Sequence, residues 1–126
     1  MDELLDRLGQ LKGYSYQIWN YNLSHSILTL RGLAEQKGHH NVHIGFADVK
    51  YFQFPFGWTG DLYPATDKEL VEILLRVGIG RLDQATSMEH VKEQFSLYRA
   101  DAAHTTIYIL GKLFEIEYDV EPIYIN

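Results

Sequence analysis

The last part of the sequence contains a stretch in which apolar and acidic residues alternate without interruption. In the stretch from Leu113 to Glu121, the even-numbered residues are apolar and the odd-numbered residues after Leu113 carry a carboxylate. Side chains of a β-strand point alternately to the two faces of a sheet, so this pattern predicts a strand with one buried and one solvated face. Half-buried strands of this kind are typical of antiparallel sheets. The predicted buried face comprises Phe114, Ile116, Tyr118 and Val120, and the predicted solvated face comprises Glu115, Glu117, Asp119 and Glu121.

Three further segments have the composition of strands. Each is rich in β-branched and aromatic residues and is bounded by residues such as Gly, Pro, Asn or Ser, which favour turns. These segments predict a hairpin over residues 16–31, a strand from 42 to 56 and a strand over residues 105–110. In the hairpin, Trp19, Tyr21 and Leu23 are predicted to share one face. Gly111 and Lys112 predict a turn before the alternating stretch.

Two helices are indicated by their ends as well as by their apolar spacing. Thr66 and Glu69 are spaced as in a capping box, in which the two side chains satisfy free backbone N–H groups at the start of a helix. An apolar stripe with helical spacing follows and Gly78 ends it, which predicts a helix over residues 67–77. The first residues of the chain combine early acidic residues with a leucine stripe, and they predict a short helix over residues 2–12.

The remaining segments complete the predicted fold. A second capping-box pattern at residues 86–89 predicts a shorter helix over 88–95, whereas residues 95–100 fit either a helix or a strand. The predicted fold is α+β, with an antiparallel sheet of about five to six strands, a main helix (about 67–77) covering one face and a short N-terminal helix. A length of 126 residues without linkers or repeats predicts a single domain, 1–126.

Charge and composition exclude several classes of function. The chain has a net charge of −6 and its Lys and Arg residues are scattered, whereas binding to a nucleic-acid backbone requires clustered positive charge. The uncharged stretch from Gly13 to Leu30 contains too many polar residues for a membrane span. The chain has no Cys, and its acidic start lacks the pattern of a secretory signal. We therefore expect a cytoplasmic protein that binds neither nucleic acid nor membrane.

Histidines are the candidate metal ligands of the sequence. His39 and His43 have the spacing that brings two ligands together on a helix. However, Gly38 precedes them and a strand pattern follows, and in an extended chain they would lie roughly 13 Å apart. The sequence leaves open whether they meet His25 and His40 in space. No nucleophile elbow or phosphate-binding loop is present, so we expect no catalytic residues, metal or cofactor.

The run YFQFPFGWTGDLYP in the middle of the chain holds six aromatic side chains. Its phenylalanines, Phe52, Phe54 and Phe56, have the same parity as the apolar residues at the start of this strand, which predicts that they extend the core face. Trp58 and Tyr63 lie beyond the strand, next to glycines. A Trp in this setting either folds back over the core or stands at the surface as an anchor for a partner. Both interpretations remain open.

The carboxylates of the alternating stretch form a row on one face of the predicted strand. Residues 113–126 contribute −4 of the net charge of −6, because they contain four acidic residues and no Lys or Arg. Neighbours in the row lie ~6.5–7 Å apart, close enough to repel one another. The row is either a solvated face that Lys or Arg on a neighbouring strand partly neutralises, or a docking surface for a basic partner. Calcium fits less well, because its ligands converge on one point.

These observations favour a non-catalytic, acidic protein-binding module, such as a small inhibitor or immunity-type protein that binds a basic partner. One alternative is a small-molecule-binding or enzymatic domain with an aromatic-lined pocket near Trp58. Another is a structural subunit of a homo-oligomer that pairs through a sheet edge or an apolar patch. The predicted partner-binding residues are Glu115, Glu117, Asp119, Glu121, Trp58 and Tyr63.

Overall fold

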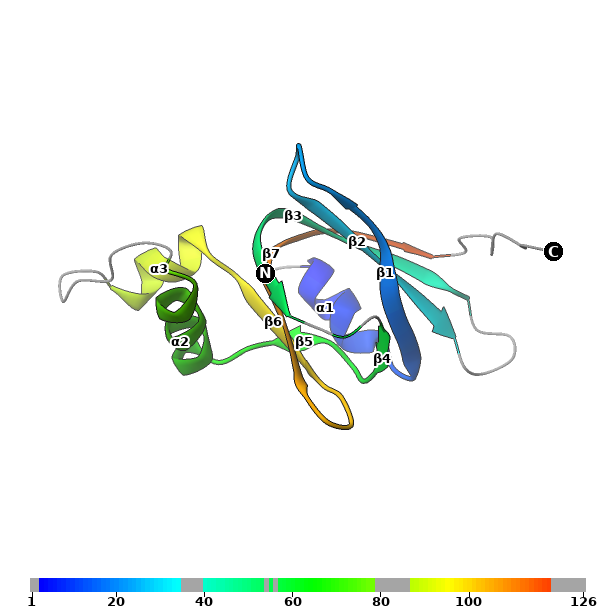
Figure 1. Ribbon diagram of the computed structural model, residues 1–126. Coiled ribbons are helices and arrows are strands. Elements are labelled where there is room, and N and C mark those ends of the chain that lie inside the picture. The colour runs from blue at the N-terminus through cyan, green and yellow to red at the C-terminus, as the bar shows by residue number, and fades with distance from the viewer. Residues whose placement is uncertain (1–2, 35–39, 54, 56, 79–86, 119–126) are drawn as a thin grey trace.

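The structure of the chain is a computed structural model that describes residues 3–34, 40–53, 55, 57–78 and 87–118. These residues form one antiparallel sheet of seven strands, in the order β4-β1-β2-β3-β7-β6-β5, and three helices (Figure 1). The predicted α+β class with an antiparallel sheet is therefore confirmed. The helices are α1 (Glu3–Gln10), α2 (Asp67–Val77) and α3 (Met88–Gln94), and the strands are β1 (Tyr14–Asn22), β2 (Ile27–Ala34), β3 (Val42–Gln53), β4 (Gly57–Thr59), β5 (Tyr63–Pro64), β6 (Leu97–Asp101) and β7 (Thr106–Tyr118).

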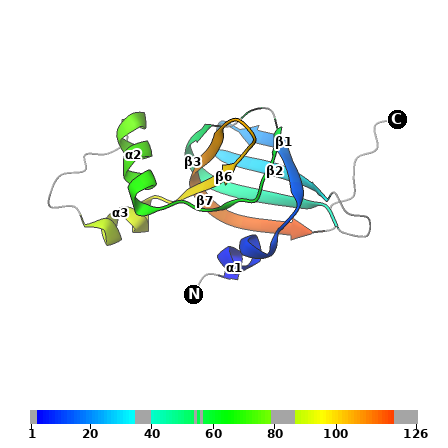
Figure 2. The same ribbon diagram turned by 90° about the horizontal axis from the view of Figure 1, so that it is seen from below.

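The sheet curls into a half-barrel (Figures 1 and 2). Its two outermost strands, β4 and β5, belong to one short segment, residues 57–64, which pairs with β1 at one edge and with β6 at the other. Gly60 lies between the two pairings, where a Cβ atom would lie only 2.6 Å from the carbonyl oxygen of Asp101. A glycine at this position therefore lets the connection pass close to β6 as it runs from one edge of the sheet to the other.

Two hydrophobic clusters lie on opposite faces of the sheet. In β6, Tyr98 and Ala100 belong to the first cluster and Leu97 to the second. Because successive strand residues point to opposite faces, the first cluster fills the inside of the curve and the second lies outside it. Leu8 and Leu11 pack into the first cluster, whereas α2 and α3 contribute to the second, and Figure 2 shows these two helices apart from α1.

The helix predictions are confirmed in part. Thr66 and Glu69 form the predicted capping box, and α2 occupies residues 67–77 as predicted. α1 lies within the predicted segment. The cap of α3 is Ser87, whose hydroxyl accepts from the N–H of His90, whereas the predicted cap, one residue earlier, lies outside the described residues. The main helix covers only part of the outer face, because its apolar contacts are with β6, β7 and the end of β3.

The predicted turn at Gly111 and Lys112 is wrong, because β7 runs through both residues without interruption. A Cβ atom at Gly111 would lie 2.9 Å from the Cγ2 atom of Val49 and 3.3 Å from the carbonyl oxygen of Ala47. This glycine therefore allows close packing against β3 rather than a change of direction. The two strands predicted at the end of the chain are one strand, and the short β4 and β5 raise the count above the predicted five to six.

The strict alternation predicted for the acidic stretch is also broken. The pairing of Gly45 with Glu115 is followed by that of Phe46 with Leu113, so Phe114 is an extra residue in a bulge. A bulge reverses the phase of the side chains on either side of it. Phe114 is consequently 44% exposed rather than buried, whereas Ile116 remains in the core as predicted. Tyr118, which was also predicted to be buried, is exposed near the end of the strand. Val120, the last member of the predicted buried face, lies outside the described residues.

The strand predicted over residues 42–56 is shorter than expected. β3 ends at Gln53, and residues 57–59 form a separate strand that pairs with β1. Phe54 and Phe56 lie outside the described residues, whereas Phe52 packs against the first cluster as predicted. The structure also decides the segment 95–100, which fits either a helix or a strand by sequence. Most of it belongs to strand β6, which covers residues 97–101.

The close packing at Gly111 leads to a stability prediction. We expect Gly111→Ala to lower the free energy of unfolding by about 1–3 kcal/mol, because the added methyl group has no room beside Val49. Gly9→Ala is the matched control: a Cβ atom at Gly9 meets nothing within 4 Å, so alanine should stabilise α1 by about 0.5–1 kcal/mol. Urea denaturation of both variants measures the difference, and an unchanged Gly111→Ala would contradict the packing argument.

Candidate functional site

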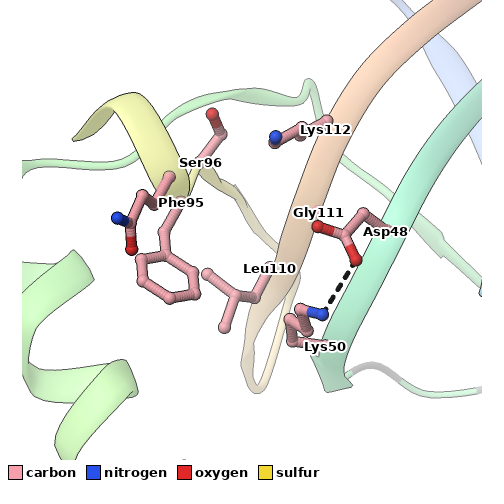
Figure 3. A pocket seen from close by; sticks show the side chains of 8 residues that line it. Asp48, Lys50, Phe95, Ser96, Leu110, Gly111 and Lys112 are labelled. Atoms are coloured by element: carbon pink, nitrogen blue, oxygen red, sulfur yellow. Dashed lines mark ion pairs between the residues drawn. The ribbon is translucent and has the colours of Figure 1, made fainter. Parts of the chain in front are cut away.

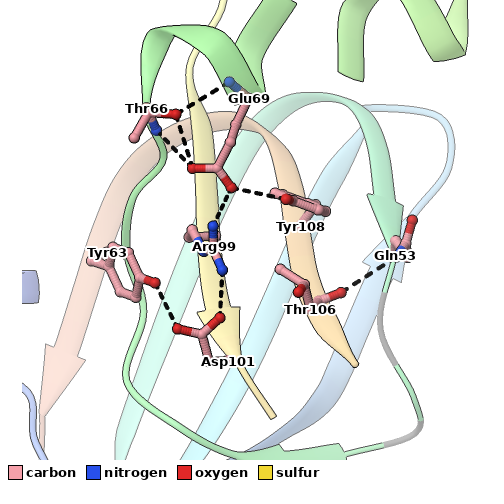
Figure 4. Close-up of polar contacts among 8 residues, drawn as sticks. All are labelled: Gln53, Tyr63, Thr66, Glu69, Arg99, Asp101, Thr106 and Tyr108. Carbon is pink, nitrogen blue, oxygen red and sulfur yellow. Dashed lines mark hydrogen bonds and ion pairs between the residues drawn. The ribbon is translucent and has the colours of Figure 1, made fainter. Parts of the chain in front are cut away.

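A charged network joins the start of α2 to the outer face of β5, β6 and β7 (Figure 4). Glu69 accepts from the backbone N–H and the hydroxyl of Thr66, both at 3.1 Å, and from the Tyr108 hydroxyl at 2.8 Å. The guanidinium of Arg99 forms ion pairs with Glu69 and, at 2.5 Å, with Asp101. Asp101 also accepts from the hydroxyl of Tyr63 at 2.8 Å.

The pKa shifts of this network indicate a structural role. Burial raises the pKa of Glu69, but hydrogen bonds from Thr66 and Tyr108 and the charge of Arg99 outweigh burial, so the pKa lies below its ordinary value. The hydrogen bond from Arg99, followed by that from Tyr63, lowers the pKa of Asp101. Acid–base catalysis by two carboxyl groups uses environments that push their pKa values apart. Here both carboxyl groups are held ionised, and the network ties α2 to the sheet.

A small crevice lies on the same side of the molecule, between the end of α3 and the part of β3 after Ala47, where the register of β3 with β7 shifts (Figure 3). Its walls include Ser96, Lys112 and the ion pair that Asp48 and Lys50 form at 2.8 Å. The volume is about 10 Å³, which is enough for no more than about one water molecule. The crevice is therefore too small to be a ligand site.

The outer surface of β1, β2, the first half of β3 and the last half of β7 is not covered by any of the described helices (Figure 1). A row of Cα partners crosses it from Gln17 through Arg31 and His43 to Glu117. The residues beside this row, such as Leu30 and Ile44, are buried on the opposite side of the sheet. We call this surface the open face, and it comprises Gln17, Trp19, Arg31, His43, Phe114, Glu115 and Glu117.

Trp19 lies over the middle of the row. A bulge between Ile18 and Asn20 makes Trp19 an extra residue of β1, so the prediction that Trp19 and Tyr21 share a face is wrong. The indole ring packs 4.8 Å from the guanidinium of Arg31 and 5.4 Å from the ring of His43. Arg31 is only 8% exposed as a result, yet Trp19 itself remains 38% exposed.

Glu115 and Glu117 form a carboxyl pair on the open face. The side-chain hydrogen bond with Glu117, then burial and the charge of Glu117, raise the pKa of Glu115. The Cα partners of the pair on β3 are Gly45 and His43. Among the described residues, no Lys or Arg forms an ion pair with either carboxylate. The neutralisation by a neighbouring Lys or Arg that the sequence left open is therefore not found within the described part of the chain.

Two of the other predicted binding residues, Trp58 and Tyr63, are not part of the open face. Trp58 is 6% exposed, packs against Tyr16 at 5.4 Å between ring centroids and donates to the carbonyl oxygen of Gly60. Of the two interpretations left open by the sequence, Trp58 therefore folds back onto the core and is not a surface anchor. Tyr63 is exposed and belongs to the charged network. Asp119 and Glu121 lie outside the described residues, as does His39.

The remaining histidines do not form a metal site in the described part of the chain. No three His, Asp or Glu side chains come close enough there to hold an ion. The backbone N–H of His25 donates to the Asn22 side chain in the turn between β1 and β2, whereas His43 packs against Trp19 and is opposite Glu117. None of the described helices has the length and apolar character needed to cross a bilayer.

The sequence gives no sign of Arg31 and Arg99 as site residues and suggests His43 only as a metal ligand, because the partners of all three are distant in the chain and depend on strand register. The bulges that expose Trp19 and Phe114 have no sequence signal as clear as the capping box of α2.

Comparisons with protein-family models, curated proteins and solved structures find no match for this chain.

The network around Glu69 predicts a pH-dependent stability. A lowered pKa stabilises the fold above the ordinary pKa of a Glu, and this contribution is lost as the pH falls through the lowered value. Glu69→Gln keeps a capping acceptor for Thr66 but removes the charge that faces Arg99. We expect the variant to lose about 1–3 kcal/mol of stability at pH 7 and progressively less below about pH 4.

Urea denaturation between pH 3 and 7, values chosen to bracket the ordinary pKa of about 4.3, measures this dependence. Glu72→Gln, an exposed position of the same helix, is the control and should change stability by less than about 0.5 kcal/mol. Equal loss in the two variants, or a loss in Glu69→Gln that does not depend on pH, would contradict the role assigned to the network.

Proposed function

We propose that the chain is a non-catalytic, cytoplasmic protein-binding module whose open face docks a basic protein, as a small inhibitor or immunity-type protein would. The main supporting observation is that the acidic side chains of Glu115 and Glu117 lie together on an uncovered sheet surface, where no described Lys or Arg forms an ion pair with them. Two adjacent carboxylates repel each other when both are ionised. A guanidinium or ammonium group of a partner would offset this repulsion by pairing with both carboxylates.

The aromatic side chains beside the pair support the same proposal. Trp19 and Phe114 are both more than a third exposed, and exposed Trp and Phe side chains beside charged groups are common at protein interfaces. A shallow depression of about 340 Å³ shares Gln17 with the open face and is lined by Ser15, Leu33 and Thr59, among others. It offers room for a side chain of the partner next to the charged area.

Polar groups under Trp19 offer a further contact. The Nε atom of Arg31 and the Nε2 atom of His43 are buried without a hydrogen-bond partner. Buried polar atoms without a partner are costly, so a hydrogen-bonding group of the partner that reached under the indole would stabilise the complex. Edge-to-edge pairing in a homo-oligomer has less support, because the two edge strands have three and two residues and short edges resist such pairing.

The proposal predicts that Glu115→Gln/Glu117→Gln weakens binding at least about tenfold, since it removes both charges that a basic partner would meet. The immobilised chain would be used to recover proteins from a lysate of its native cell. Each recovered basic protein would then be purified and titrated calorimetrically against the wild type and the variant. Binding to the wild type should weaken at high salt, because salt screens exposed charges.

Glu89→Gln/Glu93→Gln is the matched control. It makes the same change in charge at two exposed positions of α3, away from the open face, and should change affinity by less than about twofold. A partner that binds the open-face variant as tightly as the wild type would refute the proposal. Loss of binding in both double variants alike would also refute it, because net charge and not the open face would then explain the affinity.

A further inference from the structure

A second concave site lies away from the open face, beside β5 and β6, and α1, α2 and α3 each contribute to its lining. The cavity has a volume of about 170 Å³. A cavity of about 150 Å³ with apolar walls holds a benzene ring in another protein, so this one can take a side chain of that size. The walls are mostly apolar and comprise Leu5, Pro64, Ala65, Leu70, Phe95 and Leu97, with Ser96 and Tyr98 beside them.

Two opposite charges lie in the lining of this cavity. The Oδ1 atom of Asp67, the first residue of α2, is 3.4 Å from the Nζ atom of Lys92 in α3. Both side chains are more than half exposed, so their mutual attraction contributes little to stability. Opening this ion pair therefore costs little, and a ligand that offers each side chain a new partner of opposite charge can take its place.

The combination of an apolar cavity and an opposed pair of charges restricts the class of ligand. A carboxylic acid without a positive group would pair with Lys92 and leave Asp67 facing a like charge. An amine without a carboxylate would pair with Asp67 and repel Lys92. A zwitterion places an ammonium and a carboxylate on one carbon atom, so it satisfies both side chains and leaves no net charge at the rim.

We propose that this cavity binds a free α-amino acid with a large apolar side chain. The α-ammonium pairs with Asp67, the α-carboxylate pairs with Lys92, and the side chain enters the space between Leu70, Phe95 and Leu97. Both the α2 cap and the α3 end are fixed by their own hydrogen bonds, so the walls of the site are largely preformed. A ligand of this size is expected to bind with a Kd between about 10 μM and 1 mM.

Isothermal titration of the full chain with L-phenylalanine tests the proposal. We expect saturable binding at one site, and binding at least about tenfold weaker for 3-phenylpropanoate, for phenethylamine and for glycine. The first two probes each lack one charge, and glycine lacks the apolar side chain. No heat of binding with L-phenylalanine at about 10 mM, far above the expected Kd, would overturn the proposal. Equal affinity for a singly charged probe would overturn the assignment of a zwitterion.

Two substitutions locate the site. Lys92→Gln and Asp67→Asn each remove one charge at an exposed position, so both variants should fold, and each should weaken binding of L-phenylalanine about tenfold or more. Lys68→Gln, an exposed neighbour in α2 that does not line the cavity, should leave the affinity within about twofold. Unchanged binding in Lys92→Gln would overturn the proposal, because the amino acid would then bind elsewhere.

Sedimentation tests the other occupant of such a groove, a second copy of the chain. A dimer that does not bind L-phenylalanine would mean that the chain itself covers the cavity, and would overturn the proposal. The Glu115→Gln/Glu117→Gln variant should bind L-phenylalanine like the wild type, since the open face and the cavity share no residue. Failure of the docking function therefore leaves the cavity proposal intact, and the reverse also holds.

Discussion

The pairing of β3 with β7 along most of their lengths connects the two hydrophobic clusters of the fold. Residues of β7 alternate between the clusters, with Ile107 and Ile109 inside the curve and Leu110 outside it. Register shifts in this pairing divide it into segments, and Gly111 lets the strands approach at one of them. α2 and α3 pack on only one half of the outer surface of this sheet. The other half is left uncovered, and it is the open face.

The two outer halves of the sheet differ in how their charges are satisfied. On the covered half, Glu69, Arg99 and Asp101 pair with one another and with tyrosine hydroxyls, so ionised groups are stabilised within the fold. On the open face, Glu115 and Glu117 share one face of β7, and the nearby Glu117 raises the pKa of Glu115. Charged groups that the fold itself does not neutralise are better suited to a partner of opposite charge. This contrast is the physical basis for assigning a structural role to the network and a binding role to the open face.

The clearest predictions from sequence concern features that depend on neighbours in the chain. The bounds of α2 follow from the capping box at Thr66 and Glu69 and from the stop at Gly78. The pairing of β1 with β2 follows from a turn between two apolar segments. The predictions that failed concern irregular strands. A glycine in β7 resembles a turn residue when its distant neighbour Val49 is unknown, and the bulge at Phe114 is not apparent in an otherwise regular alternation.

The sequence by itself determined the α+β class, the helix over residues 67–77, the strand character of the acidic stretch and the acidic charge of its described solvent-facing residues. These depend on local hydrogen bonding, on side-chain period and on composition. Tertiary structure decided that Trp58 is buried while Trp19 is exposed, that Arg31, His43 and Glu117 lie in one row across the sheet, and that Asp67 and Lys92 flank one cavity. Each of these depends on strand register or helix packing between residues far apart in the chain, and the period of the sequence does not specify such contacts.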